Sequence, residues 1–190
     1  MNYIPTATLE FLSSLNSNNN KEWFAENKSI YELAKQDFVC FIEKLIASIA
    51  QFDALVGDVE AKKAIFRIYR DTRFSNDKTP YKTNMGAHIV AYSKKPHDRA
   101  GYYLHIEPNN CFLAGGAYLP PAPWIKAIRQ EIEYNADEYR SIVNAKDFKK
   151  YFGEVEGEKL KTAPKDYPKD HPEIELLKHK SFLAVHNLQD

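Results

Sequence analysis

Four short stretches in the middle of the sequence are rich in Ile, Val, Tyr and Phe and are bounded by turn residues. They cover residues 64–70, 86–92, 101–107 and 111–119. Such stretches are typical of β-strands that follow one another antiparallel, and Pro108-Asn-Asn110 predicts a tight turn between the last two. The chain is therefore expected to contain a β-sheet, which excludes a purely helical bundle.

Helical patterns lie on both sides of these strands. Apolar residues recur at three- and four-residue spacing in 21–51, with a kink expected near Asn27 to Ser29, and again in 123–134 and 136–152. A last short strand is expected at 181–185. Strands grouped between helices predict an α+β fold, a central antiparallel sheet of about four or five strands with helices packed mainly on one face.

The length and composition predict a single domain over residues 1–190. With 190 residues, of which 44% are hydrophobic, the chain can build a core without a disulfide or metal. Cys40 and Cys111 lie in apolar runs, where inert buried thiols are expected. No apolar run reaches the roughly 18 residues of a membrane span, and the N-terminus has no signal-peptide pattern. We therefore expect a cytoplasmic protein without a membrane partner.

The charges of the chain are balanced overall but not locally. The 26 basic and 26 acidic side chains cancel, which excludes a uniformly basic nucleic-acid binder. Residues 61–100, however, hold ten basic and three acidic side chains, a net charge of +7. Such an excess suits an anionic partner. We interpret Lys62, Lys63, Lys94 and Lys95 as solvated surface lysines, so the arginines carry the signal.

The densest polar run is F-R-I-Y-R-D-T-R-F-S-N-D-K-T-P-Y-K-T, which covers residues 66–83. Its basic side chains lie at the end of a predicted strand and in the loop that follows: Arg67, Arg70, Arg73, Lys78 and Lys82. A guanidinium binds phosphate or carboxylate through two parallel hydrogen bonds, so the run predicts an anion- or phosphate-binding loop. The alternative is a structural network in which the arginines pair with Asp71 or Asp77 and fix the loop to the sheet.

A second set of polar residues lies on the predicted strand 101–107, where Tyr103, His105 and Glu107 share one face. His105 and Glu107 form a candidate general acid–base pair, in which the carboxylate orients the imidazole. The alternatives are a hydrogen-bonded histidine on the sheet surface, and two metal ligands with His88 as a third. We assign no metal site.

Taken together, these segments resemble a widespread, mainly bacterial family known only as a conserved domain of unknown function. The resemblance rests on Asn19-Asn-Lys-Glu-Trp-Phe24, the run 66–83, Gly101-Tyr-Tyr-Leu-His-Ile-Glu-Pro108, Gly115-Gly-Ala, Leu160-Lys-Thr-Ala-Pro, Asp170-His-Pro and Lys180-Ser-Phe. It implies that the Arg-rich loop and the His-x-Glu strand belong to the family's signature, and it supplies no activity or cofactor. Members usually continue past the final strand, so this chain, which stops at Asp190, is expected to lack a C-terminal helical segment.

The leading hypothesis is a pocket for an anionic, phosphate-bearing small molecule. The five basic side chains of the run 66–83 would supply charge, and four residues would line the floor: Tyr69, Tyr81, His105 and Glu107. If the protein is an enzyme, His105 and Glu107 would exchange protons during hydrolysis or group transfer at phosphate. Whether it is an enzyme, and with which cofactor, is left open.

Two alternatives use the same residues differently. A nucleic-acid-binding module would use the basic 62–99 segment, with Tyr69, Phe74 and Tyr81 stacking on bases. A protein-interaction domain would use the arginines only to hold its own structure.

Overall fold

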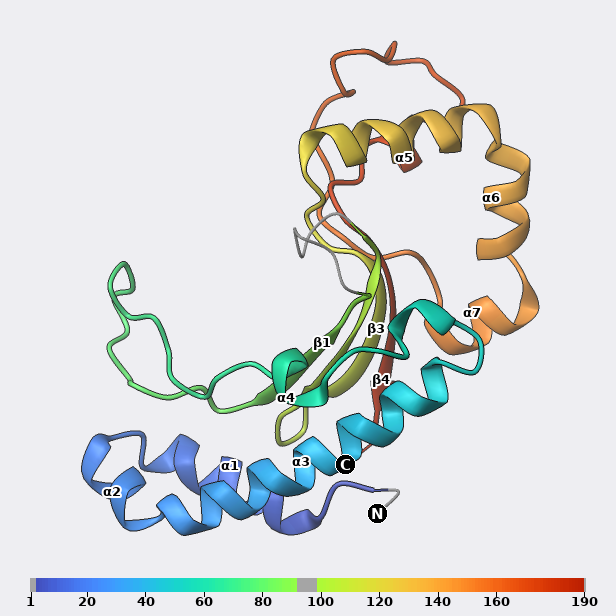
Figure 1. Ribbon diagram of the computed structural model, residues 1–190. Coiled ribbons are helices and arrows are strands. Elements are labelled where there is room, and N and C mark those ends of the chain that lie inside the picture. The colour runs from blue at the N-terminus through green and yellow to red at the C-terminus, as the bar shows by residue number, and fades with distance from the viewer. Residues whose placement is uncertain (1–2, 92–98, 190) are drawn as a thin grey trace. The chain divides into compact units, whose positions relative to one another are not determined.

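The computed structural model describes residues 3–91 and 99–189 (Figure 1). Its elements are α1 (Thr6–Ser17), α2 (Lys21–Glu26), α3 (Lys28–Ile49), the 3-10 turn η1 (Ala54–Val56), α4 (Ala61–Ala64), β1 (Met85–Ile89), β2 (Gly101–Ile106), β3 (Cys111–Ala117), α5 (Ala122–Tyr134), α6 (Ala136–Val143), α7 (Lys146–Phe152), α8 (Ile174–Leu177) and β4 (Phe182–Leu188). The predicted α+β class is confirmed.

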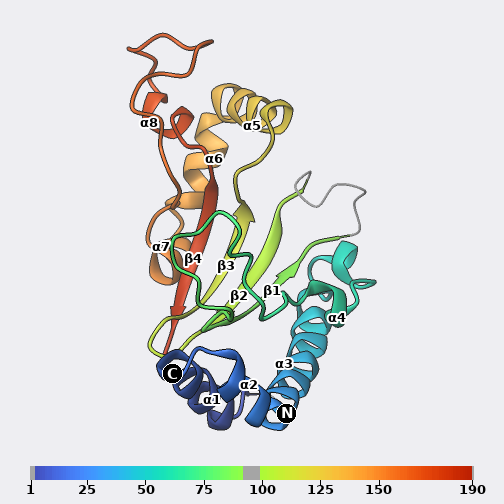
Figure 2. The same ribbon diagram turned by 90° about the vertical axis from the view of Figure 1, so that its left-hand side faces the viewer.

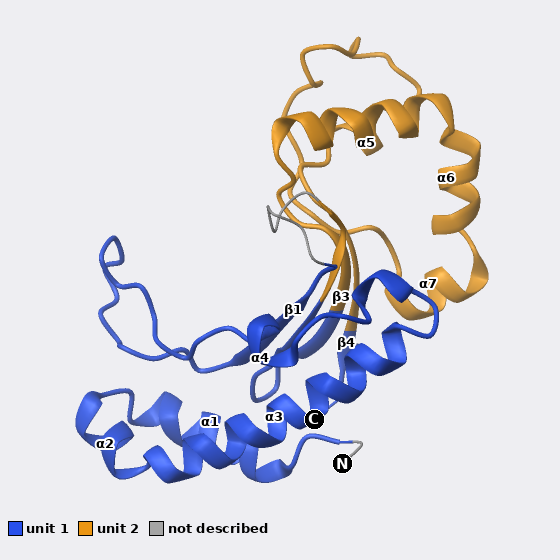
Figure 3. Cartoon of the chain, in the orientation of Figure 1, with its two compact units in different colours: residues 1–92, 103–113, 187–190 blue, residues 93–102, 114–186 orange. Residues whose placement is uncertain are grey.

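The four strands form one antiparallel sheet in the order β1-β2-β3-β4, so every strand lies beside its neighbours in the sequence (Figure 2). By the contacts between its residues the chain divides into two compact units (Figure 3). Residues 1–92, 103–113 and 187–190 form the first unit, and residues 93–102 and 114–186 form the second. The single-domain organisation stays a prediction.

In the first unit, α1, α2 and α3 carry the helical core. The Asn20 side chain accepts a hydrogen bond from the Trp23 N–H at 2.9 Å and so caps α2. Asn27 separates α2 from α3, so the chain forms two helices where the sequence predicts one helix with a kink. On α3 the spacing of four residues places Phe38 and Ile42 on one face, and both are fully buried.

The predicted strand at 64–70 is wrong. Ala64 ends α4, and the rest of the stretch pairs with the chain before and in β1 only at isolated bridges, Ile65 with Ala87 and Tyr69 with Tyr81. The stretch is rich in residues that favour β-strands, but the ladder of backbone hydrogen bonds is interrupted between the two bridges. The predicted strand 86–92 is present as β1, and residues 92–98, with Lys94 and Lys95, lie outside the described residues.

In the second unit, the predicted helix 136–152 is two helices, α6 and α7, with Asn144 and Ala145 between them. Gly153 ends α7 with a φ of 70°, a left-handed conformation that glycine adopts without strain. The strand expected at 181–185 is β4.

Of the two cysteines that are predicted to be buried, only one is buried. Cys111 is buried as predicted, but Cys40 is exposed on α3, because its place in the helix points it away from the apolar face.

Across residues 3–91 and 99–189, no helix has the length and apolar character needed to cross a membrane.

Candidate functional site

The candidate site is built on two antiparallel segments of the first unit, 65–70 and 80–87. Backbone hydrogen bonds join Arg70 N to Pro80 O at 2.9 Å, Lys82 N to Ile68 O at 2.8 Å, and Phe66 N to Gly86 O at 2.9 Å. These bonds fix the register of the Arg-rich run against the chain that leads into β1.

Thr83 and Asn84 lie at a bulge in this pairing. From Ile68 back to Phe66 the first segment spans two residues, whereas from Lys82 to Gly86 the second spans four, so the second has two residues in excess. A bulge leaves the extra residues out of the ladder and re-aims their side chains. Thr83 Oγ1 donates to Glu107 Oε1 at 2.9 Å, and Asn84 Nδ2 lies 3.2 Å from His105 Nδ1. The bulge therefore connects the Arg-rich run to the polar residues of β2.

Asn19 holds the same segment from the helical side. Its Nδ2 donates to the Tyr81 carbonyl oxygen at 2.9 Å, and its Oδ1 accepts from the Tyr81 N–H at 3.1 Å. The Tyr81 ring is buried, with 6% of its surface exposed, and stacks on Phe24 of α2 with the ring centroids 3.9 Å apart. This pair fixes Tyr81, and hence Lys82 after it, against the loop between α1 and α2.

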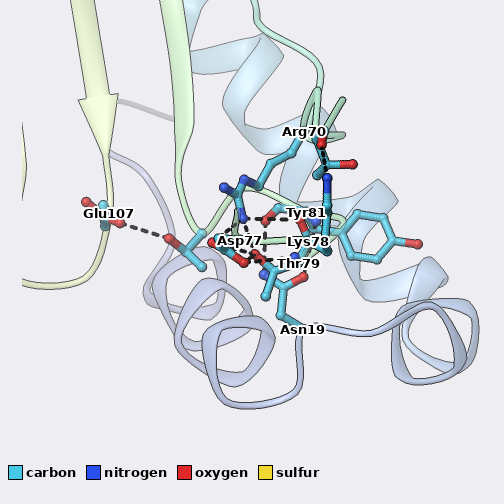
Figure 4. Close-up of polar contacts among 9 residues, drawn as sticks. Asn19, Arg70, Asp77, Lys78, Thr79, Tyr81 and Glu107 are labelled. Atoms are coloured by element: carbon cyan, nitrogen blue, oxygen red, sulfur yellow. Dashed lines mark hydrogen bonds and ion pairs between the residues drawn. The ribbon is translucent and has the colours of Figure 1, made fainter. Parts of the chain in front are cut away.

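Arg70 turns back onto its own loop (Figure 4). Its Nη1 contacts Asp77 Oδ2 at 2.5 Å, the Thr79 carbonyl oxygen at 3.2 Å and the Thr79 hydroxyl. Hydrogen bonds from the Thr79 N–H, Arg70 and the Thr79 hydroxyl lower the pKa of Asp77 to about 2. The Arg70 guanidinium is thus paired with a carboxylate that is ionised at neutral pH.

The other loop cations are more exposed. Arg73 pairs with Asp71 through Nε at 2.9 Å and Nη2 at 2.6 Å, with 76% of its side chain exposed. Lys78 Nζ donates to the Thr72 carbonyl oxygen at 2.9 Å. These contacts are what the structural alternative for the run 66–83 predicts.

A pocket of about 350 Å³ lies beside the Arg70 pair, and we call it the Lys82 pocket. Its lining comprises Asn16, Asn19, Arg70, Asp77, Thr79, Tyr81, Lys82, Thr83 and Asn84, all of which belong to the first unit. Amide and hydroxyl groups dominate this lining, and Asp77 already pairs with Arg70. The pocket therefore combines amide side chains with the basic residue Lys82.

Lys82 has no ion pair within the described parts of the chain, and the charge of its neighbour Arg67 acts on Asp71. The Lys82 Nζ lies 5.2 Å from the centre of the Phe66 ring, and its side chain is half-buried. Burial, and then the positive charge of Arg67, lower the pKa of Lys82 below its ordinary value. An anion next to Lys82 would counteract both effects and raise the pKa of Lys82.

His105 is at the centre of a hydrogen-bonded cluster on β2. Its Nε2 lies 3.2 Å from Glu107 Oε2, and its Nδ1 lies 2.9 Å from the Tyr103 hydroxyl oxygen. The Phe112 ring of β3 stacks on the imidazole with the ring centroids 4.7 Å apart, and 14% of the His105 side chain is exposed. The alternation of side chains along the strand brings these residues together, as the sequence pattern indicates.

Glu107 and Tyr103 differ in protonation. Burial raises the pKa of Glu107, but hydrogen bonds from Asn110, His105 and Thr83 outweigh it and leave that pKa below its ordinary value. Burial, and then the negative charge of Glu107, raise the pKa of Tyr103. Near neutral pH, Glu107 is therefore an ionised acceptor and Tyr103 keeps its hydroxyl proton.

The structure brings together only some of the residues that the sequence predicts. Arg70, Tyr81 and Lys82 line the pocket; His105 and Glu107 lie next to its wall and contact it through Asn84 and Thr83.

The remaining predicted residues lie outside this lining. Tyr69 is half-exposed and packs on Tyr81, with the ring centroids 5.5 Å apart. Arg67, Arg73 and Lys78 are exposed. Sequence reasoning missed Asn16, Asn19, Thr83 and Asn84 as lining residues, because the bulge and the Asn19 pair have no periodic signal.

The metal alternative has no support within the described residues. Across 3–91 and 99–189, no group of three His, Cys, Asp or Glu side chains is placed to hold a metal ion. His88 does not join His105 and Glu107 in such a group.

The chain belongs to the family described as conserved hypothetical protein (DUF2461), whose profile matches residues 7–190. This confirms the resemblance that the sequence motifs indicate. Neither the curated proteins nor the solved structures contain a match to the chain.

Proposed function

We propose that the Lys82 pocket binds an anionic, phosphate-bearing small molecule. The observation that carries this proposal is Lys82 itself, a half-buried ammonium in a pocket, next to Arg67 and without a carboxylate partner among the described residues. Ammonium groups removed from water are ordinarily paired, so the missing partner is expected to be a ligand.

The neutral lining is suited to the same ligand. Asn16 and Asn84 carry amide groups that can donate to phosphate oxygens, whereas the hydroxyls of Thr79 and Thr83 already donate to Asp77 and Glu107. The pocket volume of about 350 Å³ is at the small end of the range for ligand sites, which favours a metabolite over a polymer.

The proposal does not rest on the loop arginines. Arg70 and Arg73 each pair with a carboxylate, which supports a structural role for both. Lys82 has no such pair. An anion pocket is therefore compatible with structural arginines, because Lys82 balances the negative charge of the ligand.

His105 and Glu107 are proposed as the groups that carry a proton beside the ligand. They contact the lining residues Asn84 and Thr83 rather than the pocket itself. A direct acid–base role would need the ligand to reach past Asn84.

A thermal-shift screen of phosphorylated metabolites, nucleotides and divalent metals tests the proposal. A ligand at about 100 times its dissociation constant stabilises the folded state by about 2.7 kcal/mol, roughly 5–10 °C for a chain of this length. We expect phosphorylated compounds to shift the wild type and to lose most of that shift in Lys82→Met. Lys149→Met, an exposed lysine on α7, is the control and should respond like the wild type.

Two outcomes would contradict the proposal. The first is that no phosphorylated compound stabilises the wild type. The second is affinity for single-stranded oligonucleotides that falls steeply with salt and is lost in Phe74→Ala, which would favour the nucleic-acid alternative. For that alternative Phe74 is 95% exposed and Tyr69 50%, whereas Tyr81 is buried against Phe24.

A further inference from the structure

Three side chains face the ring nitrogens of His105, one as a hydrogen-bond acceptor and two as donors. Glu107 is ionised and can only accept, so the proton of the neutral imidazole lies on Nε2, facing Glu107 Oε2 at 3.2 Å. Nδ1 then has a single lone pair. The Tyr103 hydroxyl at 2.9 Å and Asn84 Nδ2 at 3.2 Å both compete for it.

Asn84 is the member of this pair that also lines the Lys82 pocket. While one N–H of its NH₂ group faces Nδ1, the side chain has one further N–H and its carbonyl oxygen for other partners. An acceptor oxygen does not favour an anion. In this arrangement Asn84 therefore offers phosphate at most one of its two N–H groups.

Protonation of His105 changes which group of the Asn84 side chain can face Nδ1. The imidazolium carries hydrogens on both nitrogens, so Nδ1 becomes a donor and rejects the Asn84 NH₂ group. The Tyr103 hydroxyl can rotate to accept, but an amide must turn over to present its oxygen. Turning it over frees the NH₂ group for an anion in the pocket.

We propose that the Lys82 pocket takes up its anion together with a proton on His105, and that Asn84 is the binding residue that couples the two events. This inference rests on the proposed anion pocket and adds Asn84 to its ligand-binding residues. By reciprocity, a proton that strengthens anion binding must be bound more tightly when the anion is present.

The charged and titratable groups around the imidazole agree with this coupling. Glu107, the residue after β2, stabilises the imidazolium, and Tyr103 of β2 can accept from it. From β3, the uncharged Phe112 ring covers it, and from β1 Gly86 lies against Tyr103. Lys82 lies two residues before Asn84 on the same segment.

Calorimetric titration with sulfate tests the coupling, because sulfate keeps two charges between about pH 6 and about pH 8, the range in which histidine titrates. Titrations in buffers with different ionisation enthalpies give the number of protons taken up. We expect the wild type to take up part of one proton per sulfate, and its affinity to rise roughly tenfold from about pH 8 to about pH 6.

Three variants separate the roles of the residues. His105→Gln should bind sulfate without proton uptake and without pH dependence. Asn84→Ala should lose roughly tenfold to a hundredfold in affinity at about pH 6, the effect of one hydrogen bond to a charged ligand, and also lose most of the proton uptake. Asn16→Ala removes a lining residue that does not contact His105, so it should bind more weakly but keep the uptake.

The outcomes distinguish this inference from the proposed function. Sulfate binding by the wild type without proton uptake, or full uptake in His105→Gln, overturns the coupling and leaves the pocket intact. Absence of sulfate binding at both pH values overturns the pocket and the coupling with it. Thermal unfolding of each variant shows whether it is folded.

Discussion

Replacing Asn19 with alanine should destabilise the wall of the Lys82 pocket by a predictable amount. Its side-chain amide bonds both backbone groups of Tyr81, at 2.9 and 3.1 Å. Both bonds are part-buried, so the substitution leaves a donor and an acceptor poorly satisfied, at about 1 kcal/mol each. We expect the free energy of unfolding in denaturant to fall by about 2 kcal/mol, and the melting temperature by roughly 4–8 °C.

Two further variants test the reasoning for Asn19. Asn19→Asp keeps an acceptor for the Tyr81 N–H but sets a carboxylate oxygen against the Tyr81 carbonyl, so near neutral pH it should destabilise at least as much as alanine. Asn18→Ala removes one exposed bond, from Nδ2 to the Ser14 carbonyl oxygen, and should cost less than about 1 kcal/mol. Equal losses for Asn19→Ala and Asn18→Ala would refute the claim that the Tyr81 pair holds the pocket wall.

Three other predictions concern the core, the β2 cluster and acid pH. Phe38→Ala should lower the free energy of unfolding by about 3–5 kcal/mol, and Phe74→Ala by less than about 0.5 kcal/mol, because Phe38 is fully buried and Phe74 is 95% exposed; similar losses in denaturant unfolding would contradict this packing. Gly86→Ala would place a Cβ 2.7 Å from the Tyr103 hydroxyl oxygen, so we expect about 1–3 kcal/mol of destabilisation and a changed His105 NMR signal; unchanged spectra would argue against this contact. The pKa of Glu107 in the folded state lies below its ordinary value. Its contribution to the free energy of unfolding is therefore complete above the ordinary pKa and is lost as the pH falls through the folded-state pKa. Glu107→Gln should therefore show a flatter loss of stability in acid, and an unchanged slope would contradict this assignment.

Periodicity predicted most of the fold because it reports which face of an element is buried. The helix across 28–49 follows from it directly, and the strands β1, β2 and β3 follow from their β-rich composition and the turn residues around them. It failed at 136–152, where apolar spacing continues across Asn144 although the chain breaks there. It failed at 64–70 for another reason, because a strand needs a partner in register and the partner segment has two residues too many.

The candidate site shows the same limit. Alternation along β2 places Tyr103, His105 and Glu107 on one face, and the structure joins them by hydrogen bonds. Composition alone does not tell which basic side chains find carboxylates. Arg70 finds Asp77, whereas Lys82 has no partner within the described residues, and that difference depends on loop geometry. Asn84 enters the pocket only because a bulge re-aims it.

An anion bound beside Lys82 would change the chemical environment of its side chain. An NMR titration with inorganic phosphate that follows the side-chain signals of Lys82 and Asn84 tests this binding. We expect saturable shifts at both residues, with Lys149 unchanged as the internal control. No shift at Lys82, or equal unsaturated shifts at Lys82 and Lys149, would contradict it.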